Sequence, residues 1–304
     1  MKIKNVHGAP LLLAAVSALL IVFSFVDTSF LSVDGNAYMS SAVLQVLIFA
    51  IPSAIWARAR GRSFTAHLRL RIFKAVDIPL LIYALGFMIF GGAAISFFLY
   101  RIAPGLFKTA GVMLMSEGVS TVGAGIYAVV SVALLPAVTE EFLFRGIIML
   151  EYERSGVALA AVLSSLTFSL IHFDLIKLPV YFFLGLVLAM VTYATRSLFA
   201  AMIVHAANNV LAMFFERYVY NAAMRQGGGI VMFAFICIAA ALLFAFLFFG
   251  ALSRAYSDLS RIGAPSDHTK RKKQGKFPYV REALTSPAFL LLLAVSAAGI
   301  ILNL

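Results

Sequence analysis

Apolar residues in this chain gather into nine long runs that are separated by short polar or basic stretches. A helix needs about 20 apolar residues to cross the hydrocarbon core of a bilayer, and it must satisfy its own backbone polar groups there. An outer-membrane barrel would instead show short segments of alternating hydrophobicity, which this sequence does not show. We therefore expect an all-α fold, a polytopic transmembrane helical bundle with about eight to nine spanning helices. The expected helices cover Pro10–Leu31, Met39–Ala57, Val76–Ile102, Val119–Leu150, Val157–Phe173, Pro179–Thr195, Leu198–Phe215, Gly229–Leu252 and Pro287–Leu304.

The composition supports the same class. Of 304 residues, 62% are hydrophobic and 12% are charged, whereas soluble domains carry roughly a quarter charged residues. The mean hydropathy is +0.99. The first run is longer than the core of a signal peptide and lacks a small-x-small cleavage site, so we interpret it as a retained helix. The single cysteine, Cys237, lies in an apolar run, which excludes a disulfide framework and a cysteine metal cluster.

The basic residues predict how the bundle is oriented. With a cytoplasmic N-terminus, 18 Lys and Arg residues fall in cytoplasmic stretches and five fall outside, which fits the positive-inside rule. The net charge of +11 therefore reflects membrane topology. The run Lys270–Lys276 is interpreted as an ordinary cytoplasmic loop, so we expect membrane lipid as a partner and no nucleic acid.

Ionisable side chains inside the apolar runs are the candidates for function. A charge at the centre of a spanning helix costs several kcal/mol unless it is paired or solvated, so such residues are usually functional. Glu140 and Glu141 lie inside the fourth expected helix, His172 ends the fifth, and His205 and Asn209 lie inside the seventh.

Residues four apart share one face of a helix, and three pairs have this spacing. They are Glu141 with Arg145, Phe168 with His172, and His205 with Asn209. The first pair could be mutually neutralising, whereas the preceding Glu140 points about 100° away and is left for another partner.

Three further positions bear on the shape of this region. Pro136 is expected to kink the helix close to the two carboxylates. Phe168 would place an aromatic wall beside an imidazole. Small residues such as Gly185 would let the sixth helix approach its neighbours closely.

Glutamate, histidine and asparagine side chains together support hydrolysis of an amide bond in two ways. A buried carboxylate can act as a general base toward water beside one imidazole, while a second imidazole and an amide donate to the oxyanion. Alternatively, Glu140, His172 and His205 could hold a zinc ion with an open position for water.

Four motifs in this region resemble those of the CAAX protease and bacteriocin-processing membrane proteins, also called the Abi family, which include CAAX prenyl protease 2. The sequence Glu140-Glu141-Phe-Leu-Phe-Arg145 looks like the Glu-Glu-x-x-x-Arg motif of that family. The remaining matches are the Phe-x-x-x-His, Phe-x-x-Gly and His-x-x-x-Asn elements, at Phe168–His172, Phe182–Gly185 and His205–Asn209. The four motifs stand in the family's order between about Leu134 and Val210.

The resemblance implies an intramembrane endopeptidase that cleaves a membrane-associated protein or peptide. Glu140 and His172 would activate water, His205 and Asn209 would stabilise the oxyanion, and Glu141, Arg145 and Phe168 would shape the site. No cofactor is then required, although zinc is possible. In eukaryotic and archaeal relatives the substrates are prenylated proteins that lose their last three residues, and bacterial relatives resemble peptide-processing enzymes, regulators or self-immunity proteins.

The same resemblance suggests how the chain is divided. We expect N-terminal transmembrane helices over 1–118, a catalytic core of four helices over 119–215, and C-terminal helices with a basic cytoplasmic loop over 216–304. We expect an integral protein of a bacterial cytoplasmic membrane, with its N-terminus in the cytoplasm.

Two other functions would use the same residues. One is a catalytically silent membrane scaffold or regulator of the same fold, and the other is a proton-coupled transporter. A transporter predicts two similar halves with broken helices, and the sequence shows no such duplication. The family's site is expected to open toward the cytosol, yet the charge-derived orientation puts His172 at the outer end of its helix. The three motif helices therefore converge only if the fifth helix is short, tilted or sunk into the bilayer.

Overall fold

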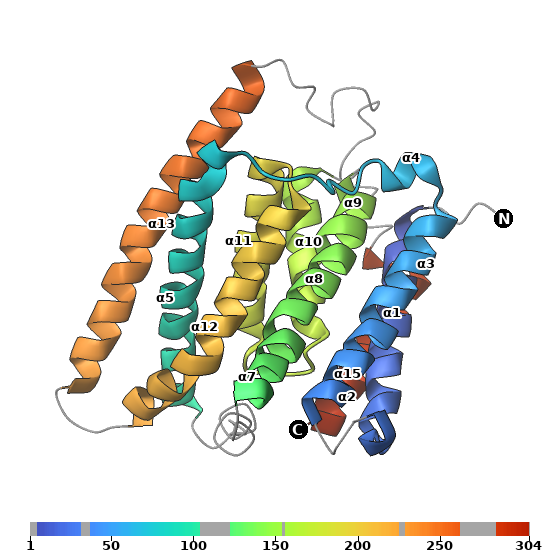
Figure 1. The fold of residues 1–304 in the computed structure, drawn as a ribbon, viewed down its shortest axis with the longest axis horizontal. Helices are drawn as coiled ribbons and strands as arrows, with labels where there is room; N and C mark the ends of the chain where they lie inside the picture. The colour runs from blue at the N-terminus through green and yellow to red at the C-terminus, as the bar shows by residue number, and fades with distance from the viewer. Residues whose placement is uncertain are drawn as a thin grey trace.

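A computed structural model describes residues 5–31, 37–103, 122–153, 156–224, 229–261 and 284–303. Throughout these ranges the regular elements are helices, without a strand, so the expected all-α bundle is confirmed. Figure 1 shows the long helices running roughly side by side, with the N-terminus at the end of the bundle opposite the C-terminus. The basic run Lys270–Lys276 lies outside the described residues.

The apolar helices of the described residues fall into a longer and a shorter group. Five are long and apolar enough to cross a membrane: Tyr38–Ala59, Ala75–Ile102, Gly125–Tyr152, Leu178–Thr195 and Gly229–Ser257. Four shorter apolar helices accompany them, at Gly8–Ser24, Val157–Leu170, Leu198–Met213 and Pro287–Leu302. Each of the nine expected runs thus forms a helix, in agreement with the expected polytopic helical bundle.

Several helix ends differ from the expected ones for local reasons. The first helix, α1 (Asn5–Ser24), ends before Leu31 because polar residues follow it, and the Ser24 hydroxyl donates back to the carbonyl of Ile21 at 2.7 Å. The helix α12 (Leu198–Met224) continues past Phe215, across the boundary expected at residue 215. The helix α13 (Gly229–Arg261) likewise continues beyond Leu252.

The helices pack side by side, and each contacts one or more neighbours. At one side α13 lies along α5 (Ile78–Ile102), which also contacts α12 and α11 (Leu178–Thr195). In the middle α11 packs on α10 (Val157–Leu170). At the other side α1 pairs with α15 (Pro287–Asn303). The segment that carries the Glu-Glu-x-x-x-Arg motif lies between these two sides.

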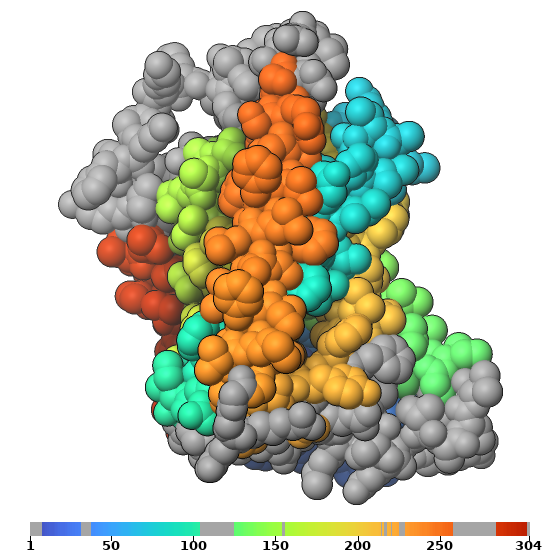
Figure 2. Space-filling view, turned by 90° about the vertical axis from the view of Figure 1, so that its left-hand side faces the viewer, coloured from blue at the N-terminus to red at the C-terminus, as the bar shows by residue number. Residues whose placement is uncertain are grey.

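The outer faces of the bundle are apolar, as a lipid environment requires. Only 6% of the most apolar window of α13 is buried, and Phe235, Leu242 and Phe246 are among its exposed side chains. Figure 2 shows this helix lying along the face of the molecule. A surface of this kind would aggregate in water, so it supports an integral membrane protein.

Two neighbouring helices are widened by π-helical turns just before a proline. In the first, α2 (Ala37–Gln45) passes through the π-helix η2 (Val46–Ala50) into α3 (Ile51–Ala59), with Pro52 at its start. In the second, α7 (Val122–Val129) passes through η5 (Val130–Leu134) into α8 (Leu135–Glu141), with Pro136 at its start. A proline ring clashes with the carbonyl four residues earlier, and a wider turn relieves that clash. The kink expected at Pro136 therefore takes the form of a π-helical turn.

A connector crosses one end of the bundle and ties its helices together. After α3 the chain forms α4 (Arg62–Thr65), then runs to the 3-10 turn η3 (Ala75–Asp77) that leads into α5. Arg60 pairs with the buried Glu151, and Arg69 pairs with the buried Glu153. Because both carboxylates are almost fully buried, these pairs hold the connector against the end of α9 (Met149–Tyr152).

Gly185 allows α11 to approach α10 closely, as its small size predicts. A Cβ atom at this position would lie 2.9 Å from the Cβ of Ser165, nearer than real Cβ contacts allow. The same glycine supplies its carbonyl oxygen to Arg145 at 3.0 Å. The Phe-x-x-Gly element therefore determines the packing of two helices beside the candidate site.

Replacing Gly185 by alanine should destabilise the bundle. We expect a loss of about 1–3 kcal/mol in the free energy of unfolding, because the added methyl group overpacks the α10–α11 contact. Thermal unfolding in detergent measures the change. Gly92→Ala on α5 is the matched control, since its Cβ would meet its neighbours at 3.8 Å and 3.9 Å. A Gly185→Ala protein as stable as the Gly92→Ala protein would contradict the packing role.

Candidate active site

The two glutamates occupy the last positions of α8, and a third π-helical segment follows them directly. This segment, η6 (Phe142–Ile148), carries Arg145. Arg145 Nη1 donates to Glu141 Oε1 at 2.6 Å, so the expected pair is confirmed. His205 Nδ1 lies 2.9 Å from the same carboxylate oxygen. Glu141 therefore joins an arginine of its own helix to a histidine of α12.

Arg145 links three elements through one buried guanidinium. Its Nη2 donates to the carbonyl oxygen of Gly185 on α11, and its Cζ lies 4.7 Å from the centre of the Phe168 ring on α10. Arg145 is 1% exposed and Glu141 is 0% exposed. A buried charge of this kind is tolerated only when it is paired and hydrogen-bonded, so the contacts depend on one another.

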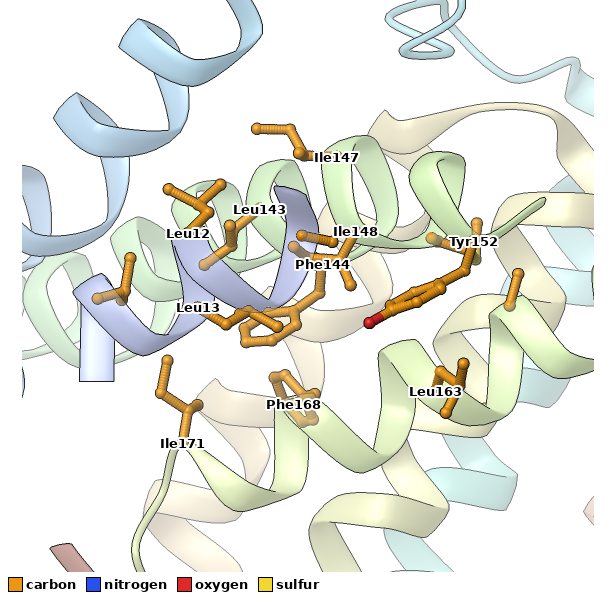
Figure 3. Close-up of a cluster of buried hydrophobic side chains, with 14 of the residues drawn as sticks. Leu12, Leu13, Leu143, Phe144, Ile147, Ile148, Tyr152, Leu163, Phe168 and Ile171 are labelled. Atoms are coloured by element: carbon orange, nitrogen blue, oxygen red, sulfur yellow. The ribbon is translucent and has the colours of Figure 1, made fainter. Parts of the chain in front are cut away.

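Phe168 separates the two candidate imidazoles. Its ring meets His172 edge to face at 5.0 Å between centroids, and it meets His205 in the same way at 5.8 Å. On its other side it packs against Phe144 at 5.2 Å, and Figure 3 shows these two phenylalanines facing each other within the buried cluster around Leu13 and Ile148. The expected aromatic wall beside an imidazole is present, and it contacts both histidines.

His172 lies in the turn just after α10. Its ring stacks on Tyr181 of α11, with 3.9 Å between centroids and 16° between planes. Its Nε2 is buried and has no hydrogen-bond partner among the described residues. The next residue, Phe173, has a φ of 52°, a left-handed conformation that is costly for a phenylalanine. Strained backbone next to an unpartnered polar group is typical of functional sites.

Glu140 has a different environment from Glu141. Gln45, from the end of α2, donates from Nε2 to Glu140 Oε1 at 3.3 Å and to Thr139 Oγ1 at 2.9 Å. Glu140 is 8% exposed. It lies within electrostatic reach of His205 and Arg145. Helix geometry predicted a partner for Glu140 from outside its own helix, and that partner is the side-chain amide of Gln45.

A cavity of about 530 Å³ contains Glu140 and His172 in its wall. Gln45 also lines it, and the other lining residues come from α1, η2, the turn after α10 and α15. They are Leu20, Ile21, Ser24, Phe25, Phe49, Ile171, Phe173, Gly299 and Leu302. The cavity is large enough for a short peptide segment and for water, and most of its lining side chains are apolar.

The short fifth helix explains why these residues meet. The helix α10 has 14 residues, which is about 21 Å at 1.5 Å per residue, whereas the bilayer core is about 30 Å thick. A helix this short would leave His172, which follows its end, within the thickness of a bilayer, and His172 lines the same cavity as Glu140.

The four ionisable groups of the site have a net charge of zero in two different protonation arrangements. With Glu140 and Glu141 ionised, Arg145 and a protonated His205 bring the net charge to zero. With Glu140 protonated and His205 neutral, the net charge is again zero. The two arrangements hold the same number of protons, so a proton can move between His205 and Glu140 without leaving an uncompensated charge in the membrane, where such a charge is costly.

Some residues of the site were not expected from the sequence. Gln45 is an amide inside an apolar run, and the cost of burying it was a signal that could have identified it. Tyr181 carries no comparable signal, because an aromatic residue in a spanning helix is ordinary. Asn209 is half-buried, four residues after His205 on α12. It does not line the cavity that contains Glu140.

The zinc alternative requires Glu140, His172 and His205 to converge on one point. Over the described ranges, no group of three His, Cys, Asp or Glu side chains is placed so that it could hold a metal ion. His205 directs Nδ1 to Glu141, and the ring of His172 is held against Tyr181. In this arrangement the three residues do not fit a zinc triad.

Residues 122–211 match the family model described as type II CAAX prenyl endopeptidase Rce1-like. This segment is similar to that family. It contains all four motifs, from Glu140 to Asn209, and the helices on either side lie outside the match. No curated protein and no solved structure matches the chain. The match supports a membrane protease of the CAAX type, and the apolar helices support an integral membrane protein.

Replacing Arg145 should destabilise the protein strongly. Arg145→Met leaves the Glu141 carboxylate buried without its cation, and we expect a loss of about 3–5 kcal/mol in the free energy of unfolding. Adding Glu141→Gln should recover part of this loss, because the unpaired charge is removed. Unfolding by a denaturing detergent, followed by circular dichroism, measures both effects.

The control for this cycle is Arg58→Met, because Arg58 is exposed. Its effect should stay within about 0.5 kcal/mol. If the losses of the two single variants simply add in the double variant, the coupling between Glu141 and Arg145 is absent.

Proposed function

We propose that the protein is an intramembrane endopeptidase that hydrolyses a peptide bond in a membrane-associated protein or peptide. In this proposal Glu140 and His172 activate water, and His205 and Asn209 stabilise the oxyanion. The observation that carries it is that Glu140 and the turn with His172 line one cavity, while His205 lies in the adjoining buried cluster.

The surroundings of Glu140 support its role as the general base. A base must have a water molecule within hydrogen-bond reach, and the cavity provides room beside the carboxylate. Gln45 holds one carboxylate oxygen, which leaves the other for the water. The buried Nε2 of His172 has no partner of its own, so it can accept or return the proton of the same water.

The contacts of His205 support its role toward the oxyanion. Because Nδ1 is engaged by Glu141, Nε2 is the nitrogen left to face a substrate. The Glu141 carboxylate stabilises the protonated ring, and a protonated ring donates from Nε2. The Asn209 amide, four residues further along the helix, would be the second donor. Glu141 and Arg145 then act as positioning residues for His205.

The same arrangement gives a proton path for hydrolysis. Glu140 takes a proton from water as the hydroxide attacks the carbonyl carbon, and the developing oxyanion is balanced by His205. Collapse of the tetrahedral intermediate breaks the C–N bond, and Glu140 returns its proton to the leaving amine. Water supplies the hydroxyl of the new carboxylate and one proton of the new amine, so no other reactant is needed.

Replacing Glu140 by glutamine should abolish cleavage while leaving the fold intact. Glutamine can still accept from Gln45 but cannot take a proton, and loss of a general base usually costs about 10²–10⁴ in rate. Quantitative proteomics of membranes that hold the active protein or the Glu140→Gln protein would reveal a shortened peptide or C-terminus. The matched control is Asp77→Asn, a half-buried carboxylate just before α5 that lies outside the cavity. Unchanged peptides with a folded Glu140→Gln protein would instead favour the silent scaffold.

We expect hydrolysis to proceed without a bound metal ion. Chelators such as EDTA and 1,10-phenanthroline should leave the cleavage rate of the purified protein within about twofold, since the glutamate mechanism needs only water. Elemental analysis of the same preparation provides the parallel measurement. Stoichiometric zinc together with chelator-sensitive turnover would overturn this expectation.

A further inference from the structure

We infer that Gly299, on the C-terminal helix α15, is a positioning residue for His172. Its contact with the ring of Phe173 fixes the turn that carries His172 beside Glu140. The catalytic meaning of this contact rests on the proposed function, in which His172 acts on the attacking water. Gly299 lies outside residues 122–211, so this support comes from beyond the segment that matches the family model.

The turn after α10 has a conformation that its own residues do not favour. Phe173 has a φ of 52°, in the left-handed region that a phenylalanine rarely adopts. Such a conformation persists only where the surrounding structure holds it. His172 and Phe173 both line the cavity together with Glu140. The conformation of this turn therefore decides where the imidazole lies relative to the carboxylate.

The ring of Phe173 lies directly on the backbone of α15. A Cβ atom added to Gly299 would lie 2.4 Å from Cδ1, 2.5 Å from Cε1 and 2.7 Å from Cγ of Phe173. Real Cβ atoms do not come this close to other atoms, so any residue other than glycine would displace the ring. Glycine is therefore required for this contact, through which α15 supports the left-handed turn.

The helix α15 is itself fixed in the bundle, so it can give this support. Its buried positions are spaced three and four residues apart and form one face. They are Phe289, Leu292, Ser296 and Gly299. Phe289 and Leu292 belong to the same buried cluster as Phe168, and the helix packs along α1 (Figure 1). The face that meets Phe173 is thus continuous with the core of the bundle.

On its other side the same turn is held by α11. The ring of His172 stacks on Tyr181, and Asp174 Oδ1 accepts from two backbone N–H groups just before α11, at 3.0 Å and 2.9 Å. These contacts do not involve Phe173. The imidazole is therefore held between α11 and a residue whose position depends on α15. Displacing the Phe173 ring would let the turn relax and would draw His172 away from Tyr181.

A small displacement matters because the imidazole and the carboxylate have to reach the same water. In the proposed mechanism Glu140 and the Nε2 of His172 exchange protons with one water molecule, which requires hydrogen-bond distances to both. A misplacement of about 1 Å can cost about 100-fold in rate. Gly299 therefore affects the rate through His172, although it takes no part in the chemistry itself.

Replacing Gly299 by alanine tests the contact. The protein is prepared in detergent with isotope-labelled histidine, and the ring signals of His172 and His205 are assigned by replacing each with glutamine. Gly250→Ala on α13 is the matched control, because its Cβ would meet nothing within 4 Å. Phe173→Ala removes the ring atoms that the added methyl group would meet, and it is combined with Gly299→Ala in a double-mutant cycle.

We expect Gly299→Ala to move the ring signals of His172, because the imidazole leaves the Tyr181 ring, and to leave those of His205 in place. Cleavage, followed by quantitative proteomics of the membranes, should fall about 10- to 100-fold. Gly250→Ala should change neither. Phe173→Ala should move the same His172 signals, and the double variant should show less than the sum of the two changes, because both act on one contact.

His172 signals and cleavage in the Gly299→Ala protein that match those of the Gly250→Ala protein would overturn the inference. Equal shifts at His172 and His205 would overturn it as well, because they indicate a general distortion. So would moved His172 signals with unchanged cleavage, in a protein that Glu140→Gln inactivates. If Gly299→Ala prevents folding, Phe173→Ala carries the test, and unmoved His172 signals there reject the contact. The histidine signals do not depend on catalysis, so a failed Glu140→Gln experiment rejects the proposed function alone.

Discussion

The buried Glu141 carboxylate is the contact on which the rest of the site depends. One oxygen of this group meets both Arg145 and His205, and Arg145 extends the link to the carbonyl of Gly185 and the face of Phe168. Four helices are thus joined through a few deeply buried polar atoms. If Arg145 or Glu141 is removed, the other charge stays buried in the membrane without a counter-charge. Each contact of the cluster therefore depends on the others.

The π-helical turns give this cluster its geometry. The turn η5 relieves the clash of Pro136, and η6 begins immediately after Glu141, so the short helix that carries the two glutamates is bounded on both sides by wider turns. Neighbouring η2 has the same relation to Pro52, and it places Gln45 against Glu140. Adjacent carboxylates thereby receive different partners, one an arginine with a histidine and the other an amide beside a cavity. Such a division of environments is what allows two like residues to have different roles.

The two ends of the bundle differ in their packing, and the candidate site adjoins one of them. The short helix α10 ends just before His172, which lines the same cavity as Glu140, and other lining residues lie near the ends of α1 and α15. At the other end the connector between α3 and α5 is held by buried ion pairs to Glu151 and Glu153. One end of the bundle is therefore closed by salt bridges and apolar packing, and the other contains the cavity with the unpartnered imidazole nitrogen.

Composition and spacing within single helices were enough to predict the class of fold, nine helical runs, the Glu141–Arg145 pair and the close approach at Gly185. The four motifs also identified the family segment. Packing between helices determines which histidine meets which glutamate and brings Gln45 and Tyr181 into the site. The same packing keeps Glu140, His172 and His205 from forming a zinc triad. Helix periodicity fixes the face on which a side chain lies but not the depth or rotation of one helix against another. His205 and Glu141 are 64 residues apart, and only packing in three dimensions brings them together.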